Sequence, residues 1–172
     1  KPIDPAHSEA FGKVVMQDHR GRMKPMNTYA SEIIRKLSRK ESLYDLTAEQ
    51  IILSMTARPK DWYSIPLIKM GKHERTKKLI PVDGKLAAYS DFFEKDGKYK
   101  LREHVRNAYN TPKKDRGVFE KEMLKLDEKV NICSMVFSGS FMKAFPVPGD
   151  ENNLWESPVT SRHHHQQTSA QG

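Results

Sequence analysis

The amino-acid sequence predicts a mostly helical α+β domain of about four or five helices with a small β-hairpin or sheet. Apolar residues recur at helical spacing in several segments, most regularly in a long C-terminal helix over residues 112–138. A short apolar run from Val14 to Gln17 precedes a glycine, which is typical of a hairpin. The 172 residues are 37% hydrophobic, which is enough for one modest core.

The charge of the chain favours anionic partners. The formal net charge is +8 and the isoelectric point is about 9.5, with a mean hydropathy of −0.76. Nucleic acid, a phospholipid surface and an acidic ligand or protein all fit such a balance. The charge carries no information about the fold.

The single cysteine, Cys133, excludes an intrachain disulfide and a cysteine-based zinc site. No run of about 18 apolar residues is present that would span a bilayer. We expect the chain to be a segment of a longer protein, because it opens in "KPIDPAHSEAFG". Residues 1–10 are predicted to be a lead-in, 11–158 a single soluble domain and 159–172 a flexible tail.

The first predicted element is a hairpin. Val14–Gln17 forms one strand, Gly21 supplies the turn, and Arg22–Lys24 returns as the partner strand. Pro25 lacks an N–H, so pairing is expected to stop there. The Phe141–Phe145 segment is expected to join this small sheet.

Two helices follow the hairpin. Asn27 or Thr28 is expected to cap the first helix, whose apolar face then recurs at helical spacing. Thr47 and Gln50 form a capping box at the start of the second helix. This helix is expected to end before Pro59, because the residue before proline avoids the α region.

The middle of the chain predicts shorter elements. "DWYSIPLIKM" is either a strand or an irregular segment, and Lys72–Leu79 is a short basic helix. Asp96 and Gly97 mark a turn, and Leu101–Tyr109 forms another helix. The long helix then starts with Thr111 as N-cap and Pro112 at the first helical position. Its seam consists of Phe119, Met123, Leu126, Val130, Cys133 and Phe137, and Gly139 is its C-cap.

Several functional motifs are absent or weak. There is no P-loop, dinucleotide fingerprint, zinc-protease motif or EF-hand loop. His163–His165 fall in the polar tail, where adjacent residues do not converge on one metal ion. The basic stretches "KMGKHERTKK" and "TPKKDRG" suit either phosphate contacts or an ordinary solvated surface.

The candidate binding residues cluster in the predicted hairpin. They are His19, Arg20, Arg22 and Lys24. Cations beside the N-terminus of the following helix favour an anion such as a carboxylate. Turn chemistry alone also accounts for the glycine and the proline in this segment, with the cations as solvated flanks.

The same segment resembles a recurring stretch of ResB/CcsA-type (system II) cytochrome c biogenesis proteins. That stretch has the form Q-x-x-G-R-x-K-P-x-x-T-x-A. The matching positions here are Gln17, Gly21, Arg22, Lys24, Pro25, Thr28 and Ala30, with a slightly longer turn before the glycine. The segments "LTAEQIILSM", "DWYSIPLIKM", "YSDFF" and "FPVPGDENNLWESP" also look similar to the soluble region of that family.

The resemblance implies a soluble periplasmic domain of a bacterial inner-membrane protein that exports haem and attaches it to apocytochrome c. The implied partners are apocytochrome c, the membrane domain of the same polypeptide and an anionic lipid surface, with no nucleic acid. The full-length parent would handle the haem, and none is expected on this segment. The tryptophan-rich motif and membrane histidines of the family are missing here, so no haem ligand or catalytic residue is transferred. The isolated domain is not expected to be an enzyme.

A different class of function stays open on the residues alone. A small basic helical domain that binds nucleic acid also fits the charge and the size. Steep salt dependence of binding would distinguish it. A free-standing hydrolase has no nucleophile and base to support it, because "FSGSF" is not a nucleophile elbow.

Overall fold

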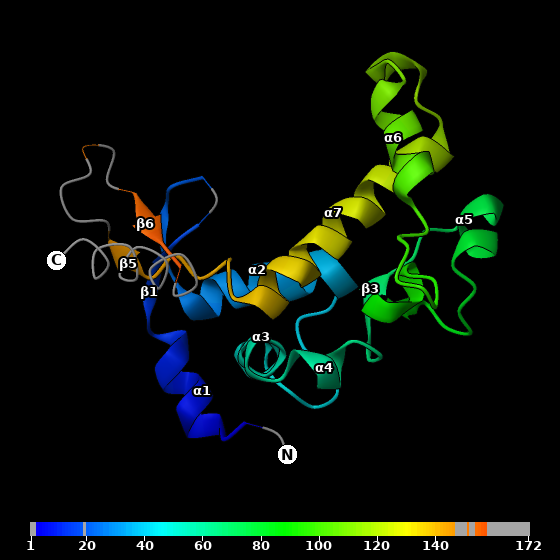
Figure 1. The fold of residues 1–172 in the computed structure, drawn as a ribbon. Coiled ribbons are helices and arrows are strands. Elements are labelled where there is room, and N and C mark those ends of the chain that lie inside the picture. The colour runs from blue at the N-terminus through cyan, green and yellow to red at the C-terminus, as the bar shows by residue number, and fades with distance from the viewer. Residues whose placement is uncertain (1–2, 19, 147–150, 152–153, 158–172) are drawn as a thin grey trace, which may run out of the picture. The chain divides into compact units, whose positions relative to one another are not determined.

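The computed structural model describes residues 3–18, 20–146, 151 and 154–157 (Figure 1). Within these residues it contains seven α-helices and three two-stranded antiparallel sheets, so the predicted mostly helical α+β class is confirmed. The helices outnumber the four or five expected, because several are too short to show a periodic pattern in the sequence. No helix among the described residues is long and apolar enough to cross a membrane.

The elements follow one another in the order labelled in Figure 1. The α-helices are α1 (Pro5–Gly12), α2 (Met26–Ser38), α3 (Ala48–Ala57), α4 (Pro59–Trp62), α5 (Glu74–Leu79), α6 (Arg102–Asn110) and α7 (Val118–Ser138). The 3-10 helices are η1 (Tyr89–Phe92) and η2 (Lys113–Asp115). The strands are β1 (Val15–Gln17), β2 (Met23–Pro25), β3 (Pro66–Lys69), β4 (Leu86–Ala88), β5 (Phe145–Pro146) and β6 (Trp155–Glu156).

The chain groups into two compact units. The first unit comprises residues 1–35, 40–59 and 134–172, and the second comprises 36–39 and 60–133. The single domain predicted over 11–158 stays a prediction. The predicted tail, 159–172, lies outside the described residues.

The first unit begins with a helix where the sequence predicted a lead-in. Asp4 caps α1, because its Oδ1 accepts from the N–H groups of Ala6 and His7 at 2.8 and 3.3 Å. The short run around Pro5 has no apolar periodicity, so only the cap could have indicated this helix. α1 packs against α3, and the Thr47–Gln50 capping box of α3 is confirmed by reciprocal bonds of 3.0 and 3.3 Å.

The hairpin of β1 and β2 forms as predicted, with one correction at its end. Pro25 stands opposite Val15 in the register instead of ending the pairing. The N–H of Met26 donates to the carbonyl of Val14 at 2.8 Å, which makes Val15 and Pro25 a non-hydrogen-bonded pair. Proline is tolerated there because no donor is required of it.

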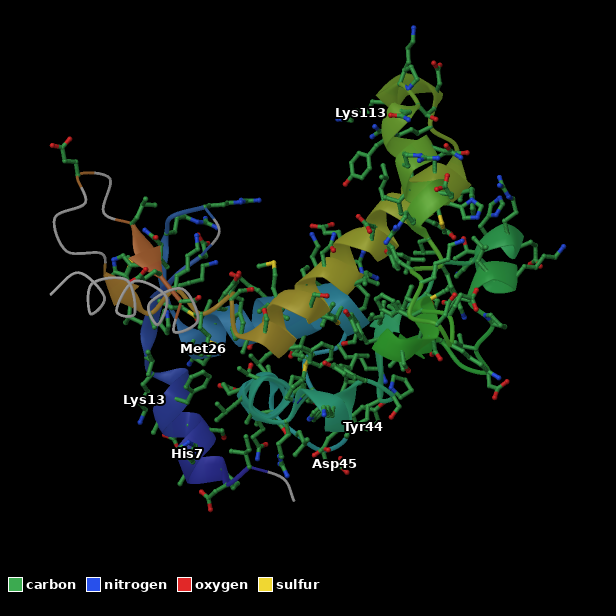
Figure 2. All side chains as sticks on the ribbon, in the orientation of Figure 1. His7, Lys13, Met26, Tyr44, Asp45 and Lys113 are labelled. Carbon is green, nitrogen blue, oxygen red and sulfur yellow. The ribbon has the colours of Figure 1, made fainter. Side chains whose placement is uncertain are left out.

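The start of α2 also differs from the prediction. The helix begins at Met26, immediately after β2, so neither Asn27 nor Thr28 precedes it as a cap. Asn27 Oδ1 instead accepts from the N–H of Thr28 at 2.6 Å, within the first turn. Figure 2 labels Met26 at this junction of strand and helix.

The core of the first unit consists of apolar side chains from several of its segments. Its buried members include Met16, Met26, Ile33, Ile34, Ile51, Ile52, Met55 and Phe141. The hairpin and the C-terminal segment meet at Gln17, whose N–H donates to the carbonyl of Lys143 at 2.9 Å. This bridge confirms that the segment after α7 lies against the hairpin.

In the second unit, the long helix starts later than predicted. α7 begins at Val118, and the residues expected to start it form η2. The Arg116 guanidinium explains the difference, because its Nε donates to the carbonyls of Ala108 and Thr111 at 2.9 and 3.0 Å. This segment therefore closes the end of α6 before α7 can begin.

The remaining predicted features of the second unit are confirmed. β3 forms from "DWYSIPLIKM", α5 from the basic stretch, and α6 close to its predicted bounds. Gly97 adopts a positive φ of 85° in the predicted turn, beside a bridge between Phe93 and Tyr99. All six seam residues of α7 are buried, from Phe119 to Phe137.

Candidate functional site

The predicted cationic hairpin has a buried carboxylate at its centre. The side chain of Asp18 lies at the end of β1 and is fully shielded from solvent. Its backbone N–H donates to the carbonyl of Arg22 at 2.8 Å, and its carbonyl accepts from the N–H of Gly21 at 3.0 Å. Gly21 has a φ of 77°, so the turn uses the glycine as the sequence predicted.

The Asp18 carboxylate organises the turn through both of its oxygens. Oδ1 accepts from the backbone N–H groups of Arg20 and Arg22 at 2.8 and 2.9 Å. Oδ2 lies 3.0 Å from Nζ of Lys24 and 3.4 Å from Nε of Arg22. A buried charge needs such partners, because burial without them carries a large free-energy cost.

Lys24 belongs to this internal network. Its side chain is 12% exposed, and its Nζ also lies 2.8 Å from Oε2 of Glu32 on α2. The ammonium stands 5.7 Å from the centroid of the Tyr29 ring, a cation–π contact. Hydrogen bonding to Glu32 raises the pKa of Lys24, and Asp18 contributes in the same direction against the opposing effect of burial.

The electrostatics of Asp18 follow from its partners. Burial alone would raise the pKa of this carboxyl group. The hydrogen bonds from the Arg22 N–H, the Lys24 ammonium and the Arg20 N–H outweigh burial and hold the pKa well below its usual value of 3.8. Asp18 therefore remains ionised at any physiological pH.

The structure separates the four predicted binding residues into different roles. Lys24 forms ion pairs with both Asp18 and Glu32, so its charge is balanced within the hairpin and α2, and its contact with an external anion stays a prediction. The Arg22 side chain is 62% exposed and Arg20 is exposed at the tip of the turn. His19 lies outside the described residues. Of the predicted binding residues that the structure describes, Arg20 and Arg22 are therefore the two with exposed side chains.

Two residues of the network were missed by the sequence reasoning, Asp18 and Glu32. An aspartate at the start of a glycine turn often accepts from backbone N–H groups two residues on, and this signal was available for Asp18. Glu32 carried no comparable signal. It pairs with Lys24 only because α2 folds back beside β2.

Gln17 fixes the base of the turn to the C-terminal segment of the first unit. Its Nε2 donates to the carbonyl of Gly21 at 3.3 Å, and its Oε1 accepts from the N–H of Trp155 at 3.1 Å. β6 lies beside the hairpin in Figure 1. The turn that carries the arginines is therefore held from within by Asp18 and from the side by Gln17.

Two of the described histidines, His73 and His104, contact neighbouring residues of the second unit. His73 caps α5 by accepting the N–H of Arg75 at Nδ1, and both His73 and His104 pack on Phe119 with ring centroids 5.5 Å away. No group of three metal-ligating side chains occurs among the residues that the structure describes. His163–His165 lie outside those residues.

Comparison with known proteins gives one informative likeness. No protein-family model matches the chain. The chain is 40% identical over 149 residues to Protein NrfI of Wolinella succinogenes. The alignment covers 86% of this chain but 16% of NrfI, so the chain spans a small part of the relative's length. The aligned region is long enough to include most of the elements described above.

Proposed function

We propose that this chain is the extracytoplasmic domain of a cytochrome c biogenesis protein that exports haem and attaches it to apocytochrome c. In this role the domain docks apocytochrome or frames the haem site from the periplasmic side of the inner membrane. The observation that carries the proposal is the 40% identity to NrfI over 149 residues, which supports a role in cytochrome c maturation. The resemblance of the hairpin motif to ResB/CcsA-type proteins supports the narrower assignment.

The structure suggests which part of the hairpin would meet a partner. Lys24 forms ion pairs with Asp18 and Glu32, whereas the side chains of Arg20 and Arg22 are exposed, with Arg22 Nε also 3.4 Å from Asp18 Oδ2. Because Asp18 already holds the backbone N–H groups of Arg20 and Arg22, the entropy cost of contact falls mainly on the two arginine side chains. Arginine also binds carboxylates through two parallel hydrogen bonds, which suits an acidic surface of apocytochrome or a haem propionate.

The experiment is a cytochrome c maturation assay with the full-length parent protein. The double variant Arg20→Gln and Arg22→Gln removes both exposed cations, and we expect it to reduce haem attachment severalfold. Arg102→Gln with Arg106→Gln is the matched control, because it removes two exposed arginines from α6. Maturation is measured by covalent haem staining of a reporter cytochrome, with immunoblotting for the level of the parent.

Three outcomes are distinguishable. Loss of haem attachment in the hairpin variant alone supports the proposed contact. Equal loss in both variants would mean that only the overall charge matters. Full activity of the hairpin variant would make the turn purely structural, and deletion of residues 11–158 without any loss of maturation would refute the proposed function itself.

A further inference from the structure

A cationic cavity in the second unit is not used by the function proposed above. It has a volume of about 650 Å³ and lies where the end of β3, α5 and the loop before β4 meet. Its charged lining consists of Lys69, Lys72, Lys77, Lys85 and Asp83. Four ammonium groups and one carboxylate give the cavity a net positive charge.

The wall of this cavity is fixed by a carboxylate of α7. Glu122 accepts from the N–H of Lys72 at 3.0 Å, from the N–H of His73 at 3.2 Å and from the hydroxyl of Thr76 at 2.6 Å. Thr76 is fully buried. A Cβ on Gly71 would lie 2.2 Å from the carboxyl carbon of Glu122, so the backbone approaches that carboxylate as closely as glycine allows. The loop that forms the wall is therefore pre-organised.

Most of the lysines in the cavity are not neutralised by the protein. Lys77 pairs with Glu74 at 3.2 Å. Within the described part of the chain, Lys69, Lys72 and Lys85 form no ion pair with an acidic side chain. Several like charges held around one hollow repel one another, and a bound anion relieves that repulsion.

Lys129 of α7 extends the positive region behind the cavity. Its Nζ donates to the carbonyl of Lys69 at 2.9 Å. Burial lowers the pKa of Lys129 to about 8, with smaller contributions from cations that include Arg39, Lys125 and Lys69. The protein thus places a fifth ammonium group beside a residue that lines the cavity.

The rest of the lining is apolar, and the volume suits a small ligand. Met70, Ile80, Pro81 and Val82 contribute the apolar surface. Pockets of about 300–1,000 Å³ with few placed polar groups are typical of small-molecule sites. Flexible ammonium groups bind phosphate oxygens as point charges, without the planar geometry that arginine requires.

We propose that this cavity binds the phosphate group of an anionic ligand. The phosphate belongs either to the headgroup of an anionic phospholipid or to a soluble phosphate compound, since both present the same chemistry to the lysines. The apolar lining contacts the part of the ligand next to the phosphate. The site is separate from the arginines of the hairpin and does not depend on the function proposed for them.

The test uses the 172-residue chain with two probes. Inorganic pyrophosphate is titrated while the amide resonances of residues 69–85 are followed by NMR, and co-sedimentation is measured with vesicles of phosphatidylglycerol and phosphatidylcholine. The pocket variant is Lys72→Gln with Lys85→Gln. Its matched control is Lys113→Gln with Lys114→Gln, which removes two exposed lysines from η2; Figure 2 labels Lys113 at that end of α6.

We expect saturable binding that the pocket variant weakens about tenfold or more and the control leaves within about twofold, since each lost ammonium within ~4 Å removes a favourable Coulomb interaction. If vesicle binding falls in the pocket variant, the phosphate belongs to a lipid headgroup. If only pyrophosphate binding falls, the ligand is a soluble phosphate compound. Equal losses in both variants, or no saturable binding of either probe, would overturn the proposal.

A second pair of variants tests the cavity without removing a lysine. Nothing lies within 4 Å of a Cβ placed on Gly84, so Gly84→Ala is tolerated in the fold. Gly84→Asp adds a carboxylate at the cavity instead. We expect the aspartate to weaken pyrophosphate or vesicle binding and the alanine to leave it unchanged. An aspartate variant that binds as well as the alanine variant would contradict the proposed site.

Discussion

At the scale of single residues, the most consequential feature is that Asp18 and Lys24 are partners. The sequence places Lys24 among cations that face outward, but the structure shows its ammonium 3.0 Å from Oδ2 of Asp18 and 2.8 Å from Oε2 of Glu32. Removing one member of such a network leaves a charge without its partner in a poorly solvated position. The stability of the hairpin therefore depends on both residues together.

Asp18→Asn is expected to lower the free energy of unfolding at pH 7 by about 2–3 kcal/mol, because the isosteric amide cannot neutralise Lys24. Asp18 has a folded-state pKa below its usual 3.8, so its contribution is present above pH 3.8 and is lost as the pH falls below that value. Urea unfolding of wild type and variant at pH 7 and at pH 3 measures both effects. The difference in the free energy of unfolding between wild type and Asp18→Asn should be smaller at pH 3 than at pH 7.

Asp45→Asn serves as the control, because Asp45 is exposed and its φ of 57° is one that asparagine also adopts. We expect a change within about 0.5 kcal/mol for this variant. A double-mutant cycle of Asp18→Asn with Lys24→Met then gives the coupling free energy of the pair. Additive effects in that cycle would rule out the interaction described here.

Lys129 gives a second expectation at the residue scale. Because its folded-state pKa of about 8 lies below the ordinary 10.5, the unfolded chain binds the proton more tightly. The contribution of Lys129 to stability therefore rises as the pH increases from about 8 towards 10.5. NMR titration of the lysine side-chain resonances should show the Lys129 signal moving with a midpoint near 8. A midpoint above 10 for Lys129 would disprove the burial described for it.

At the scale of elements, local signals identified most helices correctly, and their ends were less predictable. The capping box of α3 formed as expected because both of its bonds lie within one turn. Thr111 was expected to cap the long helix in the same manner. Its hydroxyl instead donates to the carbonyl of Asn107 at 2.8 Å, at the end of α6.

This difference between the two threonines is testable. Thr47→Ala removes a true N-cap and is expected to cost about 1 kcal/mol in the free energy of unfolding. Thr111→Ala removes an exposed bond at the end of α6 and is expected to cost less than about 0.5 kcal/mol. Thermal or urea unfolding of the two variants provides the comparison. A larger loss for Thr111→Ala would favour the helix start predicted from the sequence.

At the scale of the whole molecule, the chain is basic, mostly helical and divided into two compact units. Cys133 is fully buried, and burial raises its pKa to about 12. The thiolate, which is the reactive form, is therefore nearly absent in the folded protein. The thiol reports on unfolding because it becomes reactive only when its surroundings open.

A thiol reagent such as DTNB should label the native chain very slowly at pH 8 and the urea-unfolded chain within seconds to minutes. The labelling rate below the unfolding midpoint should follow the population of open molecules. Asp18 is far from Cys133 in the sequence. The effect of Asp18→Asn on the labelling rate of Cys133 shows whether unfolding of the hairpin is coupled to exposure of this thiol. Rapid labelling of the native wild type would contradict the burial of Cys133.

Features that depend on residues close together along the chain could be predicted from the sequence. The helical α+β class, the seam of α7, the capping box and the glycine turn all follow from periodicity and local hydrogen bonding. The hairpin that carries the candidate binding residues follows from the same local signals. The short helix α1 and the start of α7 were not predicted. α1 depends on a single cap, and the start of α7 depends on the hydrogen bonds of Arg116.

The pairing of the charges could not be predicted, because it depends on contacts that form only in the folded chain. Lys24 pairs with Glu32, and Glu122 holds the loop beside the lysine-lined cavity, through contacts between segments far apart in the sequence. From the sequence alone, a basic stretch is equally consistent with a solvated surface and with a binding pocket. Which of the two forms depends on the carboxylates that packing brings within hydrogen-bonding distance of the basic stretch. Lys69, Lys72 and Lys77 of "KMGKHERTKK" line a cavity, whereas Lys113 and Lys114 of "TPKKDRG" lie on an exposed turn.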